Sequence, residues 1–327
     1  RSVNLSRDVI SRSTGDYRKR FVIDLARRQT EAGRLPDAEA TLRAYFVDNP
    51  LDMDVFGALA TAVGDQKKDE ALAALYTEAL KRIREAGLSE DDRNAKVAEL
   101  RTGTIAALSR LGRHTEAVDQ HIEIINRDPE TYDSLETAFE YAARHDQTAR
   151  LVGYYEKLAK DSYKDYRWSL VLGRLYDLTG NTAGSVEAFR RTVVNEPQRI
   201  DFRQNLAAAM VRAGMMDDAV AELRKAWEID GKNPAWLVQV ADIRVQQGRL
   251  EEAAATIEEA IAGRKSITPG EMCNYAAMLD RWGLVEKSVA LYDRAIEAAK
   301  VRPDQSGLTA DRLSAYIRVS SRVRPPA

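Results

Sequence analysis

Residues 214–230, GMMDDAVAELRKAWEID, begin with a glycine and continue into a segment whose apolar residues recur every three or four positions. A similar stretch, GRLEEAAATIEEAIAG, begins 34 residues later at Gly248. The matching apolar positions are Ala219, Leu223 and Ala226 in the first stretch and Ala253, Ile257 and Ala260 in the second. This spacing predicts an amphipathic helix. Its recurrence at a fixed interval predicts a repeat architecture.

The same interval extends over most of the chain. Glycines that precede alanine-rich segments are Gly33, Gly112, Gly180, Gly214, Gly248 and Gly283. The gaps between them also require turns near Lys67 and Asp146, and leave eleven extra residues at 87–97, which we interpret as an insertion that interrupts the stacking. We therefore expect eight helix pairs in residues 19–302, with turns near 33, 67, 112, 146, 180, 214, 248 and 283.

Small residues at fixed offsets show how such units would pack. They are Ala207, Ala219 and Ala226 in the sixth unit, Ala241, Ala253 and Ala260 in the seventh, and Ala276, Ser288 and Ala295 in the eighth. Short side chains allow two helices to approach closely, and a single pair cannot bury its apolar face alone. The units should therefore stack on a shared core. No segment alternates apolar and polar residues over the length of a strand.

The fifth unit, YRWSLVLGRLYDLTGNTAGSVEAFRRTVVNEP, carries the clearest signature, formed by Leu172, Gly173, Tyr176, Gly180, Ser185, Phe189 and Pro197. With these residues the units resemble the tetratricopeptide repeat family. The resemblance implies an all-α, right-handed α-solenoid of antiparallel helix pairs, with the first helix of each pair on the concave face. Ile105 and Phe139 depart from the pattern, because they occupy positions that the family usually fills with small residues.

Both ends of the array should differ from its repeats. We expect residues 1–18 to form a lead-in helix or linker, and residues 303–327 to form a capping helix and tail. The apolar side of that helix is predicted to comprise Leu313, Tyr316, Ile317, Ser320 and Val323. The start, RSVNLSRDVI, lacks a methionine, so we expect a piece of a longer protein, located in the cytoplasm or periplasm. The excess of arginine over lysine and the many alanines favour a bacterial protein.

Charge and composition argue against several classes of partner. The 51 acidic and 49 basic residues nearly balance, whereas a surface built for nucleic acid normally has a basic excess. No apolar run reaches the roughly 18 residues that a membrane span needs. The single cysteine, Cys273, can form neither an internal disulfide nor a thiolate metal cage.

The residues do not favour an enzyme. His121 falls at an inward helix position and is expected in the core, whereas His114 and His145 fall in turns and are expected at the surface. Sequence motifs for zinc, phosphate and acyl-transfer chemistry do not occur. We therefore expect a non-catalytic protein that requires no cofactor and no metal.

The register implied by the resemblance places a partner-binding set on the first helices of units five to seven. Its members are Arg167, Leu170, Arg174, Gln204, Asn205, Val238, Gln239 and Asp242. The fourth unit contributes an acidic patch, Asp133, Glu136 and Glu140. The residues that some co-chaperones of this family use to hold a C-terminal carboxylate are not found at matching positions.

We expect the chain to be a protein-protein interaction scaffold that binds a partner segment in its concave groove, with an acidic residue of that segment opposite Arg174. Two alternatives remain open. The chain could be a regulatory or substrate-recruiting arm of a larger enzyme or secretion-system protein, or an RNA-binding helical repeat. The second alternative requires a basic groove and a recurrent base-reading pair, and neither is present.

Overall fold

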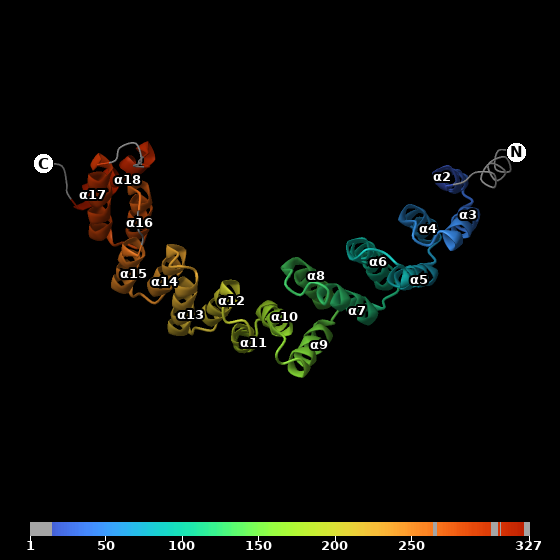
Figure 1. Cartoon of the computed structure of the whole chain (residues 1–327), viewed down its shortest axis with the longest axis horizontal. Coiled ribbons are helices and arrows are strands. Elements are labelled where there is room, and N and C mark those ends of the chain that lie inside the picture. The colour runs from blue at the N-terminus through green and yellow to red at the C-terminus, as the bar shows by residue number, and fades with distance from the viewer. Residues whose placement is uncertain (1–14, 264–266, 302–306, 308, 324–327) are drawn as a thin grey trace. The chain divides into compact units, whose positions relative to one another are not determined.

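The computed structural model describes residues 15–263, 267–301, 307 and 309–323, and every regular element in these ranges is an α-helix (Figure 1). The chain divides into two compact units, residues 1–157 and 158–327. Unit 1 contains α2 (Gly15–Glu31), α3 (Leu35–Asp48), α4 (Met53–Asp65), α5 (Asp69–Glu85), α6 (Glu90–Arg110), α7 (His114–Ile125) and α8 (Tyr132–Arg144). The boundary falls within α9 (Thr148–Asp161). Unit 2 contains α10 (Tyr166–Leu178), α11 (Thr182–Asn195), α12 (Ile200–Arg212), α13 (Met216–Ile229), α14 (Pro234–Gln246), α15 (Leu250–Ala262), α16 (Pro269–Arg281), α17 (Val285–Val301) and α18 (Ala310–Val323).

Tight turns join the two helices of each pair. The residues with positive φ include Gly33, Lys67, Gly112, Asp146, Gly180, Gly214, Gly248 and Gly283, which are the eight positions where the sequence predicts a turn. At Gly214, with φ of 76°, the next amide, of Met215, donates to the carbonyl of Met210 at 2.8 Å. This bond satisfies a carbonyl that the helix end would leave unpaired. The assignment of each helix pair to one repeat of the family stays a prediction.

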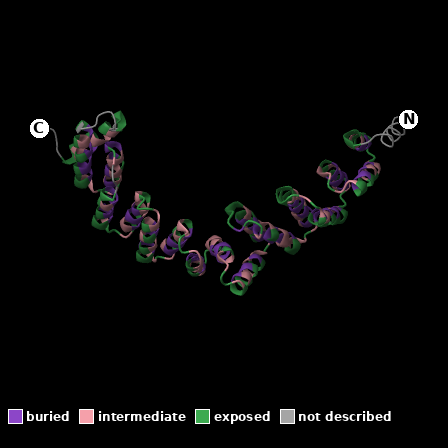
Figure 2. Cartoon of the chain, in the orientation of Figure 1, coloured by how far each residue is buried: buried purple, intermediate pink, exposed green. Residues whose placement is uncertain are grey.

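Small residues lie where neighbouring helices touch in unit 2. Ala219 of α13, Ala253 of α15 and Ala295 of α17 have no solvent exposure, as the repeat pattern predicts. Larger side chains such as Leu223 and Ile257 fill the space between successive helices. Each helix from α10 to α15 packs against the next helix in the chain, so the all-α solenoid architecture is confirmed (Figure 2).

The predicted insertion at residues 87–97 does not interrupt the packing. A short link leads into α6, where the hydroxyl of Ser89 accepts a hydrogen bond from the Asp92 amide at 3.2 Å. Three acidic residues follow in the first turn, where the helix dipole favours them. Val97 is completely buried. Most of the extra residues therefore lengthen the first helix of the third pair, and the expectation of an interruption was wrong.

The ends of the array also differ from expectation. Helix α2 begins at Gly15 rather than at Lys19, while residues 1–14 of the expected lead-in lie outside the described residues. At the other end α18 is present, but it buries Val319 and leaves Leu313 and Ile317 exposed. The predicted apolar side of α18 was therefore wrong, apart from the half-buried Tyr316 and Ser320.

Polar contacts explain the orientation of α18. The guanidinium of Arg312 donates to Asn274 at 3.0 Å, and that of Arg322 donates to Asp280 at 2.6 Å. Both partners belong to α16, so these two arginines of α18 contact the array, although the side chain of Arg322 is also exposed to solvent. Because they hold this face against α16, Ile317 is turned outward.

Candidate functional site

The predicted partner-binding residues lie on three first helices of unit 2, namely α10, α12 and α14. Arg167, Gln204 and Asp242 are exposed, and Arg174, Asn205, Val238 and Gln239 are half-buried. Leu170 is completely buried in the core of the unit together with Phe189 and Phe202. Leu170 therefore cannot contact a partner, and its assignment to the surface was wrong. The side chain of Leu170 packs in the core that includes Phe189 of α11.

The guanidinium of Arg167 is held at the start of α10. It donates from Nε and Nη2 to the two carboxylate oxygens of Asp165, at 2.9 and 2.6 Å, and it lies 5.2 Å from the ring of Trp168. Hydrogen bonds from Arg167 keep the pKa of the Asp165 carboxyl below its usual value.

Three amide side chains distinguish this surface. Gln204 and Asn205 of α12 and Gln239 of α14 form no side-chain hydrogen bond with any described residue. Each carries both donors and an acceptor, so each can bond to the backbone of an extended segment. Partial loss of water raises the pKa of the Asp242 carboxyl on α14, although Arg281 acts in the opposite direction.

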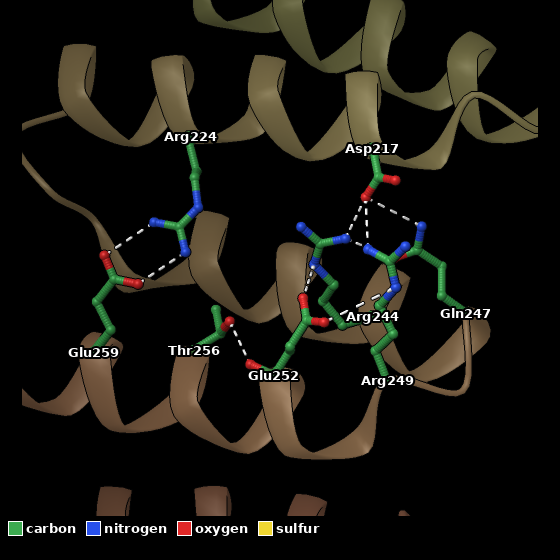
Figure 3. Close-up of polar contacts among 8 residues, drawn as sticks. All are labelled: Asp217, Arg224, Arg244, Gln247, Arg249, Glu252, Thr256 and Glu259. Carbon is green, nitrogen blue, oxygen red and sulfur yellow. Dashed lines mark hydrogen bonds and ion pairs between the residues drawn. The ribbon is translucent and has the colours of Figure 1, made fainter.

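Where α13, α14 and α15 meet, charged side chains pair with one another (Figure 3). Asp217 of α13 accepts hydrogen bonds from Arg244, Arg249 and Gln247. These bonds, first of all the one from Arg244, lower the pKa of Asp217. Such exposed pairs stabilise a protein only weakly. These ion pairs nevertheless leave the charged side chains already paired within the chain.

A second contact of this kind joins α13 to α15. Arg224 bonds through both terminal nitrogens to the carboxylate of Glu259, at 3.0 and 2.9 Å (Figure 3). The two residues are 35 positions apart, about one repeat. Similar pairs link α15 to α17, including Arg294 with Glu258 at 2.8 Å. These ion pairs therefore hold successive repeats together.

All three histidines of the chain gather around one tyrosine in unit 1. The ring of Tyr141 lies 6.1 Å from His114, 5.0 Å from His121 and 4.6 Å from His145. His114 and His145 stack at 3.9 Å with an angle of 14° between their rings. Both are half-buried and lie at the surface, where each ring covers part of the other. Residues about one repeat apart lie side by side in a solenoid, and the spacing of 31 could have revealed this stack.

Within this cluster Tyr141 and His114 form hydrogen bonds, whereas Nε2 of His121 forms none with the described residues. The Tyr141 hydroxyl lies 2.7 Å from the Ser109 hydroxyl and 3.0 Å from Nδ1 of His114. His121 is buried, as expected, but its Nε2 has no hydrogen-bond partner among the described residues. Burial lowers the pKa of the His121 imidazole to about 4, so the ring is neutral at pH 7.

No group of three or more metal-ligating side chains occurs within the described ranges. Cys273 is buried in the core of unit 2, and burial raises the pKa of its thiol, so it packs as a small apolar residue. None of the helices in the described part of the chain is long and apolar enough to cross a membrane.

A family model described as tetratricopeptide repeat matches residues 210–264, from the end of α12 through α15. These residues are therefore similar to tetratricopeptide repeats. The match covers the two stretches that begin at Gly214 and Gly248. No curated protein sequence matches the chain significantly.

Several solved structures are similar to parts of this chain. A tetratricopeptide repeat protein from Parabacteroides merdae is 19% identical, with a TM-score of 0.32 over 74% of this chain and 91% of that chain. MamA is 17% identical, with a TM-score of 0.35 over 50% of this chain and 95% of that chain. The TPR2AB domain of yeast Sti1, in a complex with pHSP90, is 14% identical, with a TM-score of 0.33 over 85% of this chain and 98% of that chain. With TM-scores this low, the family assignment depends on the sequence match.

Proposed function

We propose that the chain is a non-catalytic interaction scaffold and that α10, α12 and α14 of unit 2 bind a segment of a partner protein. The observation that supports this most is that the amides of Gln204, Asn205 and Gln239, on the first helices, have no hydrogen bonds to described residues. The charged side chains where α13, α14 and α15 meet are instead engaged with one another (Figure 3).

The same surface suits a segment that carries an acidic residue. The pair between Arg167 and Asp165 is exposed, with side-chain exposures of 48% and 25%, so its stability is small and a carboxylate of the partner can replace Asp165. The amides of Gln204, Asn205 and Gln239 would then bond to the backbone of the segment. Val238, which is half-buried, offers an apolar contact beside them.

A photo-crosslinking experiment tests this proposal. A benzophenone amino acid placed at Gln204 should form adducts with partner proteins in living cells of the native host. The matched control carries the same group at Arg190, which is exposed on the second helix α11. Equal adducts at both positions, or adducts at Arg190 alone, would overturn the assignment to the first helices.

Charge reversal supplies a second measurement. Replacing Arg167 and Arg174 by glutamate should weaken capture of the crosslinked partner and make the remaining binding less sensitive to salt. The control is Arg190→Glu, which leaves the first helices unchanged. Circular dichroism should show the same helicity for all three proteins. Capture of the partner by the double variant at wild-type level and salt dependence would contradict a role for these arginines.

A further inference from the structure

A cavity of about 550 Å³ opens in unit 1 between α6, α7 and α8. Its lining includes the apolar side chains of Ile105, Ala106 and Ile124, together with Tyr141 and His121. The volume lies within the range of about 300–1,000 Å³ that is typical of ligand pockets. Ile105 occupies a position that is small in unit 2, where Gly173 is the fifth-repeat counterpart. A bulky, half-buried residue here contributes an apolar wall to the cavity.

One polar atom in this lining lacks a partner. Nε2 of His121 is buried and makes no hydrogen bond with any described residue. By contrast, the hydroxyl of Tyr141, on the same wall, already bonds to Ser109 and His114. This atom has almost no accessible surface, so it is closed off from the cavity, and the His121 ring contributes to the wall rather than a hydrogen bond. The cavity therefore suits a large aromatic side chain.

The rim of the cavity is acidic. Asp133 and Glu140 of α8 line it, and Glu136 lies between them on the same exposed side of the helix. None of the three carboxylates forms an ion pair with a described residue. The one cation in the lining is Arg144, so three acids face one arginine. Elsewhere in the same unit acids are paired, as Asp119 is with Arg150 at 2.7 Å. The rim is therefore complementary to a basic partner.

We propose that this cavity binds the tryptophan side chain of a partner segment in which lysine or arginine residues flank the tryptophan. The indole ring fills the apolar floor beside Ile105, Ile124 and the ring of His121. The flanking cations lie over Asp133, Glu136 and Glu140. Large aromatic side chains, tryptophan above all, are typical anchors of protein interfaces. This site belongs to unit 1 and does not depend on the function proposed for unit 2.

Fluorescence anisotropy with a fluorescein-labelled, end-blocked peptide, Gly-Lys-Arg-Trp-Lys-Arg-Gly, tests the proposal on the whole chain. Ala106 is exposed at the cavity, so Ala106→Trp should fill the cavity without disturbing the fold. We expect this variant to weaken binding at least about tenfold. The matched control is Ala149→Trp, at an exposed alanine of α9 outside the cavity, which should bind as the wild type does. The pair Asp133→Lys and Glu140→Lys should weaken binding by a similar factor.

Variants of the peptide distinguish binding in the cavity from nonspecific electrostatic attraction. A peptide with alanine in place of tryptophan should lose most of the affinity, and a peptide with phenylalanine should bind less tightly than the tryptophan peptide, because its smaller ring buries less apolar area. Replacing the four basic residues by glutamate should abolish binding. The proposal is overturned if the wild-type chain does not bind the tryptophan peptide, if the alanine peptide binds equally well, or if Ala106→Trp leaves the affinity unchanged. Circular dichroism of each variant shows whether its fold is retained.

Discussion

A methyl group added at Gly173 probes the closest helix contact of the fifth pair. A Cβ atom at this position of α10 would lie 2.8 Å from Cδ1 and Cε1 of Phe189 and 3.0 Å from its Cζ. Phe189 belongs to α11 and is only 1% exposed, so its ring cannot swing into solvent. Overpacking of this kind costs about 1–3 kcal/mol. Alanine also gains about 1 kcal/mol of helix propensity over glycine. The net loss of stability for Gly173→Ala should therefore be about 0–2 kcal/mol.

A second glycine isolates the packing effect. Gly153 lies inside α9, and no atom of the described residues lies within 4 Å of a Cβ built on it. Gly153→Ala should therefore gain the propensity contribution alone and stabilise the chain by about 1 kcal/mol. The difference between the two variants measures the clash with Phe189, about 1–3 kcal/mol.

Urea unfolding followed by circular dichroism gives both values. Repeat arrays do not always unfold in one step, so hydrogen exchange of the α10 and α11 amides should accompany it. Gly173→Ala should accelerate exchange in these two helices, whereas Gly153→Ala should not. If both variants stabilise the chain equally, the contact between Gly173 and Phe189 is not as close as the structure shows, and the packing argument fails.

Other perturbations test the pH response, the helix contacts and the caps. The folded pKa of His121, about 4, lies below its unfolded value of about 6.5, so the unfolded chain binds the extra proton. The free energy of unfolding should therefore be highest above pH 6.5 and fall toward pH 4, by up to about 3 kcal/mol. The variant His121→Leu should lose this pH dependence. Urea midpoints that change equally with pH in the wild type and in His121→Leu would contradict the prediction. Leucine at Ala219 or Ala253, both fully buried, should cost about 1–3 kcal/mol by overpacking, and an unchanged thermal transition would show that these alanines do not lie at helix contacts. Thr268 and Glu271 form a capping box at the start of α16, so Thr268→Ala should cost about 1 kcal/mol in urea unfolding, whereas Thr268→Ser should cost less.

The sequence by itself determined the local structure. Helix positions follow from apolar spacing, which is a property of one segment and needs no partner. The turns follow from residues that tolerate positive φ, and at Gly180 and Gly248 the backbone reaches 75° and 74°. The buried alanines follow from the repeat, because equivalent residues in successive units meet equivalent neighbours.

Only the tertiary structure decided which of two possible faces each helix buries and which distant residues meet. On α18 the apolar residues cover more than one face, and the contacts of Arg312 and Arg322 with α16 selected the face of Val319 over that of Ile317. On α10 the side chain of Leu170 is buried in the core rather than exposed on the surface. The stack of His114 on His145 joins two turns that are 31 residues apart. Such contacts depend on the rotation of each helix about its axis, and packing against the neighbouring helices sets that rotation.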